Sequence, residues 1–183
     1  MREKIHLVIC GERGVGKSTC IRRVIRETKP EISGFITKSE SGTEDGFHDI
    51  YIHAAGQSEN ERHFGKDNLI GSCNKVIHRI NTEVFETKGV EYLTGCRGDI
   101  IVMDELGFME ADASAFQQAV IDCLEGDVPV IAAIKPRVDV CFLNRIRCMD
   151  KVEVIPIYER TREDVYLYVR DRLKEILELR CLS

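Results

Sequence analysis

The sequence lacks the features that would assign it to a membrane, to the secretory pathway or to nucleic acid. Its apolar runs are far too short to span a bilayer, and Met1–Lys4 leads directly into the first expected strand, so we expect no signal peptide. The net charge is −5 and the basic residues are dispersed, which leaves no electrostatic footprint for nucleic acid or an anionic membrane. We therefore expect a cytoplasmic protein with neither of these partners.

Metal-binding and disulfide patterns are also missing, although the chain contains eight cysteines. No two of them form a C-x-x-C pair, and no matching ligand spacing involves the histidines His48, His53, His63 and His78. Several cysteines fall on apolar positions of expected strands or helices, where a free thiol behaves as a small hydrophobe. We expect no structural metal and free thiols at Cys10, Cys20, Cys73, Cys96, Cys123, Cys141, Cys148 and Cys181.

Repeats and low-complexity segments are absent, and 183 residues with 43% hydrophobic content fit one domain spanning residues 1–183. In the second half of the chain, short β-branched runs alternate with amphipathic stretches. This pattern indicates strands at Ile100–Met103, Val128–Ile134 and Val152–Ile155, and helices at Ala111–Glu125, Val140–Met149 and Arg162–Leu179. Such alternation is typical of a parallel sheet covered on both faces, so we predict an α/β fold, a three-layer αβα sandwich with a mainly parallel sheet.

The first half of the chain contains a further hairpin signal. Gly34–Ser39 and Gly46–Ile52 read as strands flanking the polar turn Glu40–Asp45. The polar stretch Ala54–Asp67 is expected to form an exposed excursion near the nucleotide site. A strand at Lys75–Ile80 and a helix at Thr82–Leu93 complete the expected elements.

The strongest motif is a phosphate-binding loop, the Walker A pattern G-x-x-x-x-G-K-[ST]. It lies between an expected strand at Lys4–Cys10 and an expected helix at Lys17–Thr28. Its glycines allow backbone N–H groups to turn inward and form an anion nest at the start of the helix. Lys17 can reach the β and γ phosphates of a nucleotide. The predicted nucleotide-binding residues are Gly11, Glu12, Arg13, Gly14, Val15, Gly16, Lys17, Ser18 and Thr19.

Two adjacent acids at the end of the expected Ile100–Met103 strand supply a Walker B pattern. Asp104 is placed to hold the shell of a Mg²⁺ cofactor together with the hydroxyl of Ser18. Glu105 is placed to orient and deprotonate the water that attacks the γ phosphate. Acids also occur at ordinary solvated strand ends, but the phosphate loop favours the catalytic interpretation. Glu105 and Lys17 are the predicted catalytic residues.

Three other functions fit parts of the pattern. Asp104–Gly107 satisfies the D-x-x-G motif of small GTPases, but the guanine-reading N-K-x-D motif is missing, and Lys135 at the corresponding strand end is a phosphate sensor or simply exposed. A small nucleotide or metabolite kinase is the second alternative, with the Ala54–Asp67 excursion as an acceptor lid. The third is a nucleotide-gated binding or accessory protein, in which hydrolysis resets a partner interaction.

Taken together, these motifs resemble the THEP1 family of nucleoside triphosphatases over nearly the whole chain. The resemblance rests on the phosphate loop, on Gly34-Phe35 with Thr37, on Gly46-Phe47, on Phe85-Glu86 and above all on Val102–Glu110. Phe108 stands where the family carries a lysine and Ala111 where it carries a leucine, and only Arg162 matches a family turn before the last helix. The resemblance implies a RecA-like sheet, that of P-loop NTPases with an additional strand and a catalytic glutamate. It also implies slow Mg²⁺-dependent hydrolysis of several nucleoside triphosphates with weak base preference. We expect ATP and GTP among the substrates, and a monomer or weak oligomer.

Overall fold

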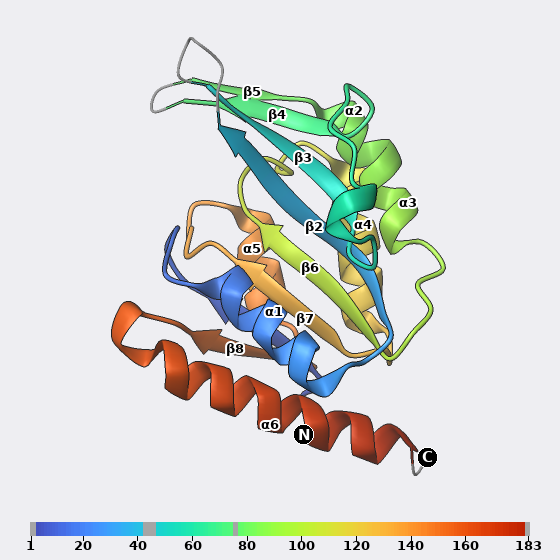
Figure 1. Cartoon of the computed structure of the whole chain (residues 1–183), viewed down its shortest axis with the longest axis vertical. Helices are drawn as coiled ribbons and strands as arrows, with labels where there is room; N and C mark the ends of the chain where they lie inside the picture. The colour runs from blue at the N-terminus through green and yellow to red at the C-terminus, as the bar shows by residue number, and fades with distance from the viewer. Residues whose placement is uncertain (1–2, 42–46, 75–76, 182–183) are drawn as a thin grey trace.

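The computed structural model describes residues 3–41, 47–74 and 77–181, which form an eight-stranded sheet flanked by helices (Figure 1). The strand order is β5-β4-β3-β2-β6-β7-β1-β8. In chain order the strands are β1 (His6–Cys10), β2 (Ile32–Ser41), β3 (His48–Ala54), β4 (Leu69–Cys73), β5 (His78–Ile80), β6 (Ile100–Leu106), β7 (Val130–Ile134) and β8 (Val152–Pro156).

The sheet has a parallel part and an antiparallel extension. Strands from β2 through β6, β7 and β1 to β8 pair in parallel, whereas β3, β4 and β5 continue the sheet beyond β2 in antiparallel pairs. The central strands read as continuous apolar runs because both faces of the sheet are covered, and every residue of β7 is buried.

Helices cover both faces of the sheet, as the predicted three-layer fold requires. α1 (Lys17–Thr28) and α6 (Arg162–Cys181) pack on one face with alternate strand residues such as Leu7 and Ile9. Val8, between these two residues, points to the opposite face of the sheet and belongs to a second hydrophobic cluster there. That cluster contains residues of α2 (Thr82–Val84), the π-helical turn Phe85–Gly89, α3 (Val90–Leu93), α4 (Ser114–Glu125) and α5 (Cys141–Arg147).

Most predicted elements are present, with shifted ends. α1 has the predicted bounds, and the expected 82–93 helix is helical throughout but contains the π-helical turn. The expected strand at 100–103 continues to Leu106, because Asp104 and Leu106 still pair with β7. The predicted strands of the hairpin are confirmed as β2 and β3, whereas residues 42–46 of its turn, like residues 75 and 76 before β5, lie outside the described residues.

One expected position is corrected by the topology. The Ala54–Asp67 segment leaves the end of β3, which is antiparallel to β2, so it departs from the sheet edge opposite the loop after β1. None of its residues lines the cavity at the phosphate loop. Glu59, in a short 3-10 helix (Glu59–Glu61), and Arg62 instead line a neighbouring cleft beside α1, which shares Asp104 with that cavity.

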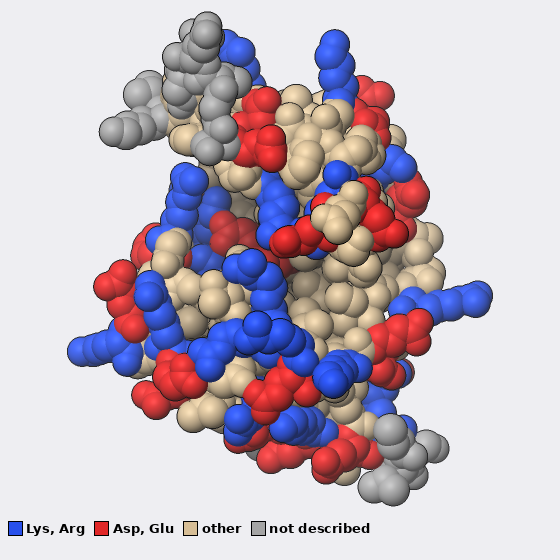
Figure 2. Space-filling model, viewed as in Figure 1, with Lys and Arg blue, Asp and Glu red and all other residues tan. Residues whose placement is uncertain are grey.

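The distribution of surface charge and the state of the cysteines follow the expectations from the sequence. Figure 2 shows basic and acidic side chains interspersed over α6, where Arg170 and Lys174 form ion pairs with Glu27 of α1. The seven cysteines from Cys10 to Cys148 are free thiols, and the expectation for Cys181 falls outside the described side chains. In the part of the chain that the structure covers, no helix combines the length and apolarity that a membrane crossing needs.

Candidate active site

The loop after β1 leads directly into α1 through two glycines. Gly14 and Gly16 have φ values of 82° and 102°, a left-handed backbone region that favours glycine. Helix α1 begins at Lys17, immediately after Gly16. A glycine-rich loop at a helix N-terminus is a setting in which backbone N–H groups bind anions, and the motif predicts such a site here.

Lys17 lies almost completely inside the site, with 3% of its surface exposed. Its ammonium donates hydrogen bonds to the carbonyl oxygens of Gly11 at 2.6 Å and Glu12 at 2.8 Å. The same nitrogen lies 3.1 Å from Oε2 of Glu105. The lysine therefore connects the phosphate loop after β1 to the acidic end of β6.

The two predicted metal ligands are adjacent. The Ser18 hydroxyl donates to Oδ1 of Asp104 at 2.8 Å, and this contact joins the start of α1 to β6. Burial raises the pKa of Asp104 to about 6, while the hydrogen bond from Ser18 acts in the opposite direction. A nearby cation would favour the charged form of this carboxyl.

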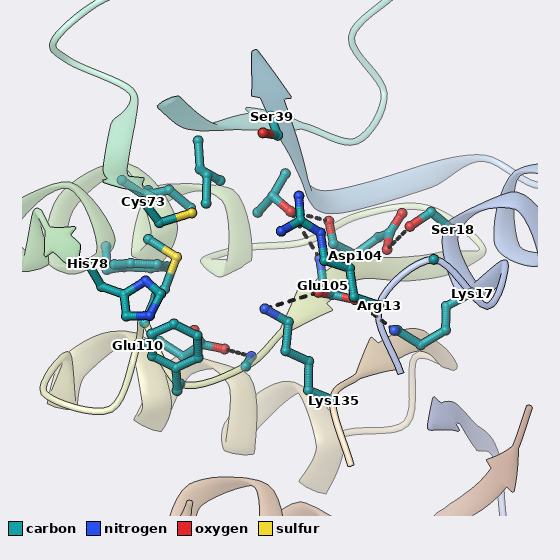
Figure 3. A pocket seen from close by; sticks show the side chains of 18 of the residues that line it. Arg13, Lys17, Ser18, Ser39, Cys73, His78, Asp104, Glu105, Glu110 and Lys135 are labelled. Atoms are coloured by element: carbon teal, nitrogen blue, oxygen red, sulfur yellow. Dashed lines mark hydrogen bonds and ion pairs between the residues drawn. The ribbon is translucent and has the colours of Figure 1, made fainter. Parts of the chain in front are cut away.

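Glu105 lies between two lysines. Its carboxylate is 3.1 Å from Nζ of Lys17 and 3.3 Å from Nζ of Lys135, which follows β7 (Figure 3). Thr37 on β2 fixes the backbone here, because its hydroxyl donates to the Asp104 carbonyl at 3.2 Å and accepts from the Glu105 N–H at 3.3 Å. The side chain of Glu105 keeps 23% of its surface exposed, so water can reach it.

Lys135 is held at this position by an aromatic ring. Its Nζ lies 5.2 Å from the ring centroid of Phe108, and the Arg137 guanidinium lies 5.5 Å from the same centroid. Phe108 occupies the position where the family that the sequence resembles carries a lysine. In this chain, Lys135 supplies a cation beside Glu105. The sequence left Lys135 either as a phosphate sensor or as an exposed residue, and its contact with Glu105 depends on β7 lying between β1 and β6.

A residue close to the C-terminal end of the chain also donates hydrogen bonds to the phosphate loop. Arg162, the first residue of α6, donates to the carbonyl oxygens of Val15 at 2.7 Å and Gly14 at 3.1 Å. In the sequence, Arg162 stands out only as the match to a family turn before the last helix. Its contact with the phosphate loop arises because the start of α6 lies against that loop.

The phosphate loop, Thr37, the two acids and Lys135 line one cavity of about 390 Å³. Predicted residues on its wall include Arg13, Lys17, Ser18, Thr19, Asp104 and Glu105. The structure therefore brings the phosphate loop and both acids together, although they are separated by more than 80 residues of sequence. A glycine-rich loop at a helix N-terminus, a buried lysine, two adjacent oxygen donors and an acid beside two lysines at parallel strand ends are typical of the P-loop nucleoside-triphosphatase class of fold and site.

Comparison with known proteins gives the family within this class. A family model described as NTPase matches residues 6–170. The chain is 30% identical over 175 residues to nucleoside-triphosphatase THEP1 of Thermotoga petrophila, an alignment covering 93% of this chain and 90% of that protein. Identity to the Methanosarcina barkeri THEP1 is 27%, with 94% and 99% coverage. The chain belongs to the THEP1 family of nucleoside triphosphatases.

Two solved structures share the fold. The crystal structure of THEP1 from Aquifex aeolicus aligns with a TM-score of 0.69 at 19% identity, covering 92% of this chain and 98% of that one. The solution structure of a human cancer-related nucleoside triphosphatase aligns with a TM-score of 0.66, also at 19% identity, with 93% and 97% coverage. The predicted α/β class with a mainly parallel sheet is thereby confirmed, and β7 between β1 and β6 matches the expected additional strand.

Proposed function

We propose that this protein hydrolyses nucleoside triphosphates, ATP and GTP among them, to the diphosphate and phosphate, with Glu105 activating the attacking water. The observation that carries this proposal is the position of the Glu105 carboxylate, 3.1 Å from Lys17 and 3.3 Å from Lys135. A carboxylate between two cations at the γ-phosphate end of the loop can accept a proton from water. The cations meanwhile stabilise charge that develops on the phosphoryl oxygens.

The donor set fits the Mg²⁺ ion that this class of enzyme uses. The hydroxyl of Ser18 and the carboxylate of Asp104 are hard oxygen donors 2.8 Å apart, and Mg²⁺ takes its remaining ligands from water and phosphate. Ser18 and Asp104 would hold the ion, which supplies charge neutralisation between the β and γ phosphates. A cation there would also favour the ionised form of Asp104, whose pKa burial raises to about 6.

The protein residues divide the remaining work. Nζ of Lys17 exchanges its bonds with the carbonyls of Gly11 and Glu12 for phosphate oxygens, while the loop N–H groups hold the β phosphate. Lys135 orients Glu105 and faces the γ phosphate from the β7 side. Thr37 keeps the Asp104–Glu105 segment in place, so that the two acids perform separate tasks.

A broad substrate range follows from what the loop recognises. The nucleotide contacts proposed here are to phosphates, and the N-K-x-D motif that reads guanine is missing from the sequence. The curated relatives are named nucleoside-triphosphatase without a specified base. We therefore propose weak discrimination among ATP, GTP, CTP and UTP, which phosphate release with each nucleotide would measure.

The decisive test is the Glu105→Gln variant in single-turnover assays with Mg²⁺ and ATP. The amide keeps the shape of the side chain but cannot accept the proton, so turnover should fall by about 10²–10⁴ while nucleotide binding is retained. Asp104→Asn is the matched variant. It should lower the rate of turnover and, in addition, weaken the dependence of that rate on Mg²⁺. Wild-type turnover in Glu105→Gln would exclude Glu105 as the base and direct attention to Glu110.

A further inference from the structure

The cavity beside Glu105 extends beyond the phosphate loop. Its volume of about 390 Å³ covers both the part at the loop, which the triphosphate would fill, and a second part beyond Glu105. The phosphate loop forms only one wall. Figure 3 shows Lys17 and Ser18 on one side of Glu105, and Cys73, His78 and Glu110 on the other. We call the second part the acceptor chamber, and its walls include Ile70, Cys73, His78, Phe108, Met109 and Glu110.

Apolar and aromatic side chains line much of the acceptor chamber, while Ser39 and Asn74 add polar groups to the same cavity wall. Ile70 is 2% exposed and Met109 is 9% exposed. The ring of Phe108 meets that of His78 edge-on, with centroids 4.9 Å apart. Among the described residues, the lysines and arginines on the cavity wall belong to the phosphate loop, except Lys135, which contacts Glu105. The chamber therefore suits a flat, uncharged body rather than a second anion.

One buried polar group in the chamber has no task in hydrolysis. Glu110 is 3% exposed, and its carboxylate accepts a hydrogen bond from the Gly107 N–H. Its backbone carbonyl accepts from the Gln117 side chain at 2.8 Å, which fixes the turn before α4. Burying a carboxyl group is costly, and a polar group on the wall of an apolar pocket typically fixes the orientation of a ligand.

We propose that the acceptor chamber binds a second substrate, an uncharged small molecule with a flat apolar body and a primary hydroxyl, and that the protein transfers the γ-phosphoryl group to this hydroxyl in competition with water. The inference rests on the proposed function, because it uses the same phosphate loop and the same base. Glu105 lies between the chamber and Lys17, so a hydroxyl bound in the chamber faces the position of the γ phosphate.

The transfer balances in the same way as hydrolysis. The acceptor oxygen forms a bond to the γ phosphorus, and the bond from that phosphorus to the β–γ bridging oxygen breaks. The electron pair of the broken bond leaves with the nucleoside diphosphate. The hydroxyl proton passes to the carboxylate of Glu105, and the products are the diphosphate and a phosphate monoester of the acceptor.

The test uses benzyl alcohol as the flat probe and ethanol as a probe without an apolar body. The intact protein is incubated with Mg²⁺ and ATP and an equal concentration of either alcohol, and phosphorus NMR quantifies phosphate monoester and inorganic phosphate. We expect the ratio of monoester to phosphate to be at least about tenfold higher with benzyl alcohol, the gain that an apolar group typically adds in a pocket.

A pair of variants locates the effect. Cys73→Trp places an indole at a half-buried position on the chamber wall, and it should lower the monoester ratio with benzyl alcohol by about tenfold. Cys148→Trp makes the same change at an exposed thiol at the end of α5 and should leave that ratio unchanged. Because the readout is a ratio, it does not depend on the amount of active protein.

The outcomes separate the two proposals. Equal ratios for benzyl alcohol and ethanol in the wild-type protein would overturn the acceptor chamber, and so would a wild-type ratio in Cys73→Trp. A second measurement needs no variant: bound benzyl alcohol should protect the Cys73 thiol, but not the Cys148 thiol, from a thiol-alkylating reagent. Absence of this protection would also overturn the proposal. Failure to release phosphate from ATP without any alcohol would instead contradict the proposed hydrolysis.

Discussion

At the scale of single residues, the site depends on how its charges are held. Lys17 is buried and contacts two loop carbonyls as well as Glu105. Arg13 belongs to the same loop but is exposed, and the described part of the structure gives it no hydrogen bond or ion pair. Two cations of one motif should therefore contribute very differently to nucleotide binding.

Lys17→Ala should abolish measurable binding of nucleoside triphosphates. The substitution removes the one cation buried within the phosphate loop, and electrostatic stabilisation in such sites is usually the largest contribution. Isothermal calorimetry with ATP and Mg²⁺ measures the loss, and circular dichroism verifies that the variant is folded. Unchanged affinity in a folded variant would contradict the assignment of the phosphate loop.

Arg13→Ala should change turnover less than tenfold. Its side chain is exposed at a variable position of the motif, and exposed charges contribute little because solvent screens them. Phosphate release from ATP at saturating concentration measures the effect, with Lys17→Ala assayed in parallel. A loss of about a hundredfold or more would mean that Arg13 contacts the transferred phosphoryl group.

At the scale of elements, the acidic end of β6 is positioned by its pairing with β2. Gly34 on β2 pairs with Val102 on β6 and has a φ of 94°. A Cβ at Gly34 would overlap the backbone carbonyl of Val102, so no side chain fits between these strands. The same strand carries Thr37, which fixes the Asp104–Glu105 backbone.

Gly34→Ala should therefore destabilise the fold by about 3 kcal/mol or more, since a backbone overlap adds to the conformational strain. Gly95→Ala is the matched control, because Gly95 also has a positive φ of 65° but a Cβ there would point into open space among the described residues. That control should lose only about 1–2 kcal/mol. Urea denaturation of both variants measures the difference, and equal losses would refute the close approach of β2 to β6.

At the scale of the whole molecule, burial of acids makes stability depend on pH. Burial raises the pKa of Glu110 from 4.5 to about 7, while the Gly107 N–H acts in the opposite direction. Between these values the folded chain binds more protons than the unfolded chain, so the free energy of unfolding falls as pH rises through this range. Buried His6 and His53 oppose this trend, because burial lowers the pKa of each to about 4.

Glu110→Gln isolates the contribution of this carboxyl. The difference in unfolding free energy, wild type minus variant, should fall by more than about 1 kcal/mol between pH 4.5 and pH 7.5. The histidines are present in both proteins, so their contributions cancel. Urea denaturation at these two pH values measures the difference, and a constant difference would show that Glu110 titrates alike in the folded and unfolded chains.

The extent to which the sequence predicts this molecule depends on the range of the interactions involved. The helix α1 and the phosphate loop follow from residues close in the chain, because glycine spacing and apolar periodicity act locally. The acids after Ile100–Met103 could likewise be paired with the loop, since parallel strands bring their carboxyl ends to one edge of the sheet.

The sequence by itself therefore determined the α/β class, the phosphate loop and the two acids, all of which are encoded in short motifs. Only the tertiary structure placed Lys135 beside Glu105, Arg162 on the phosphate loop and the Ala54–Asp67 segment outside the cavity at that loop. It also brought His78 and Phe108 together across the antiparallel extension of the sheet. These contacts depend on strand order and on pairing between distant segments, which local periodicity does not encode.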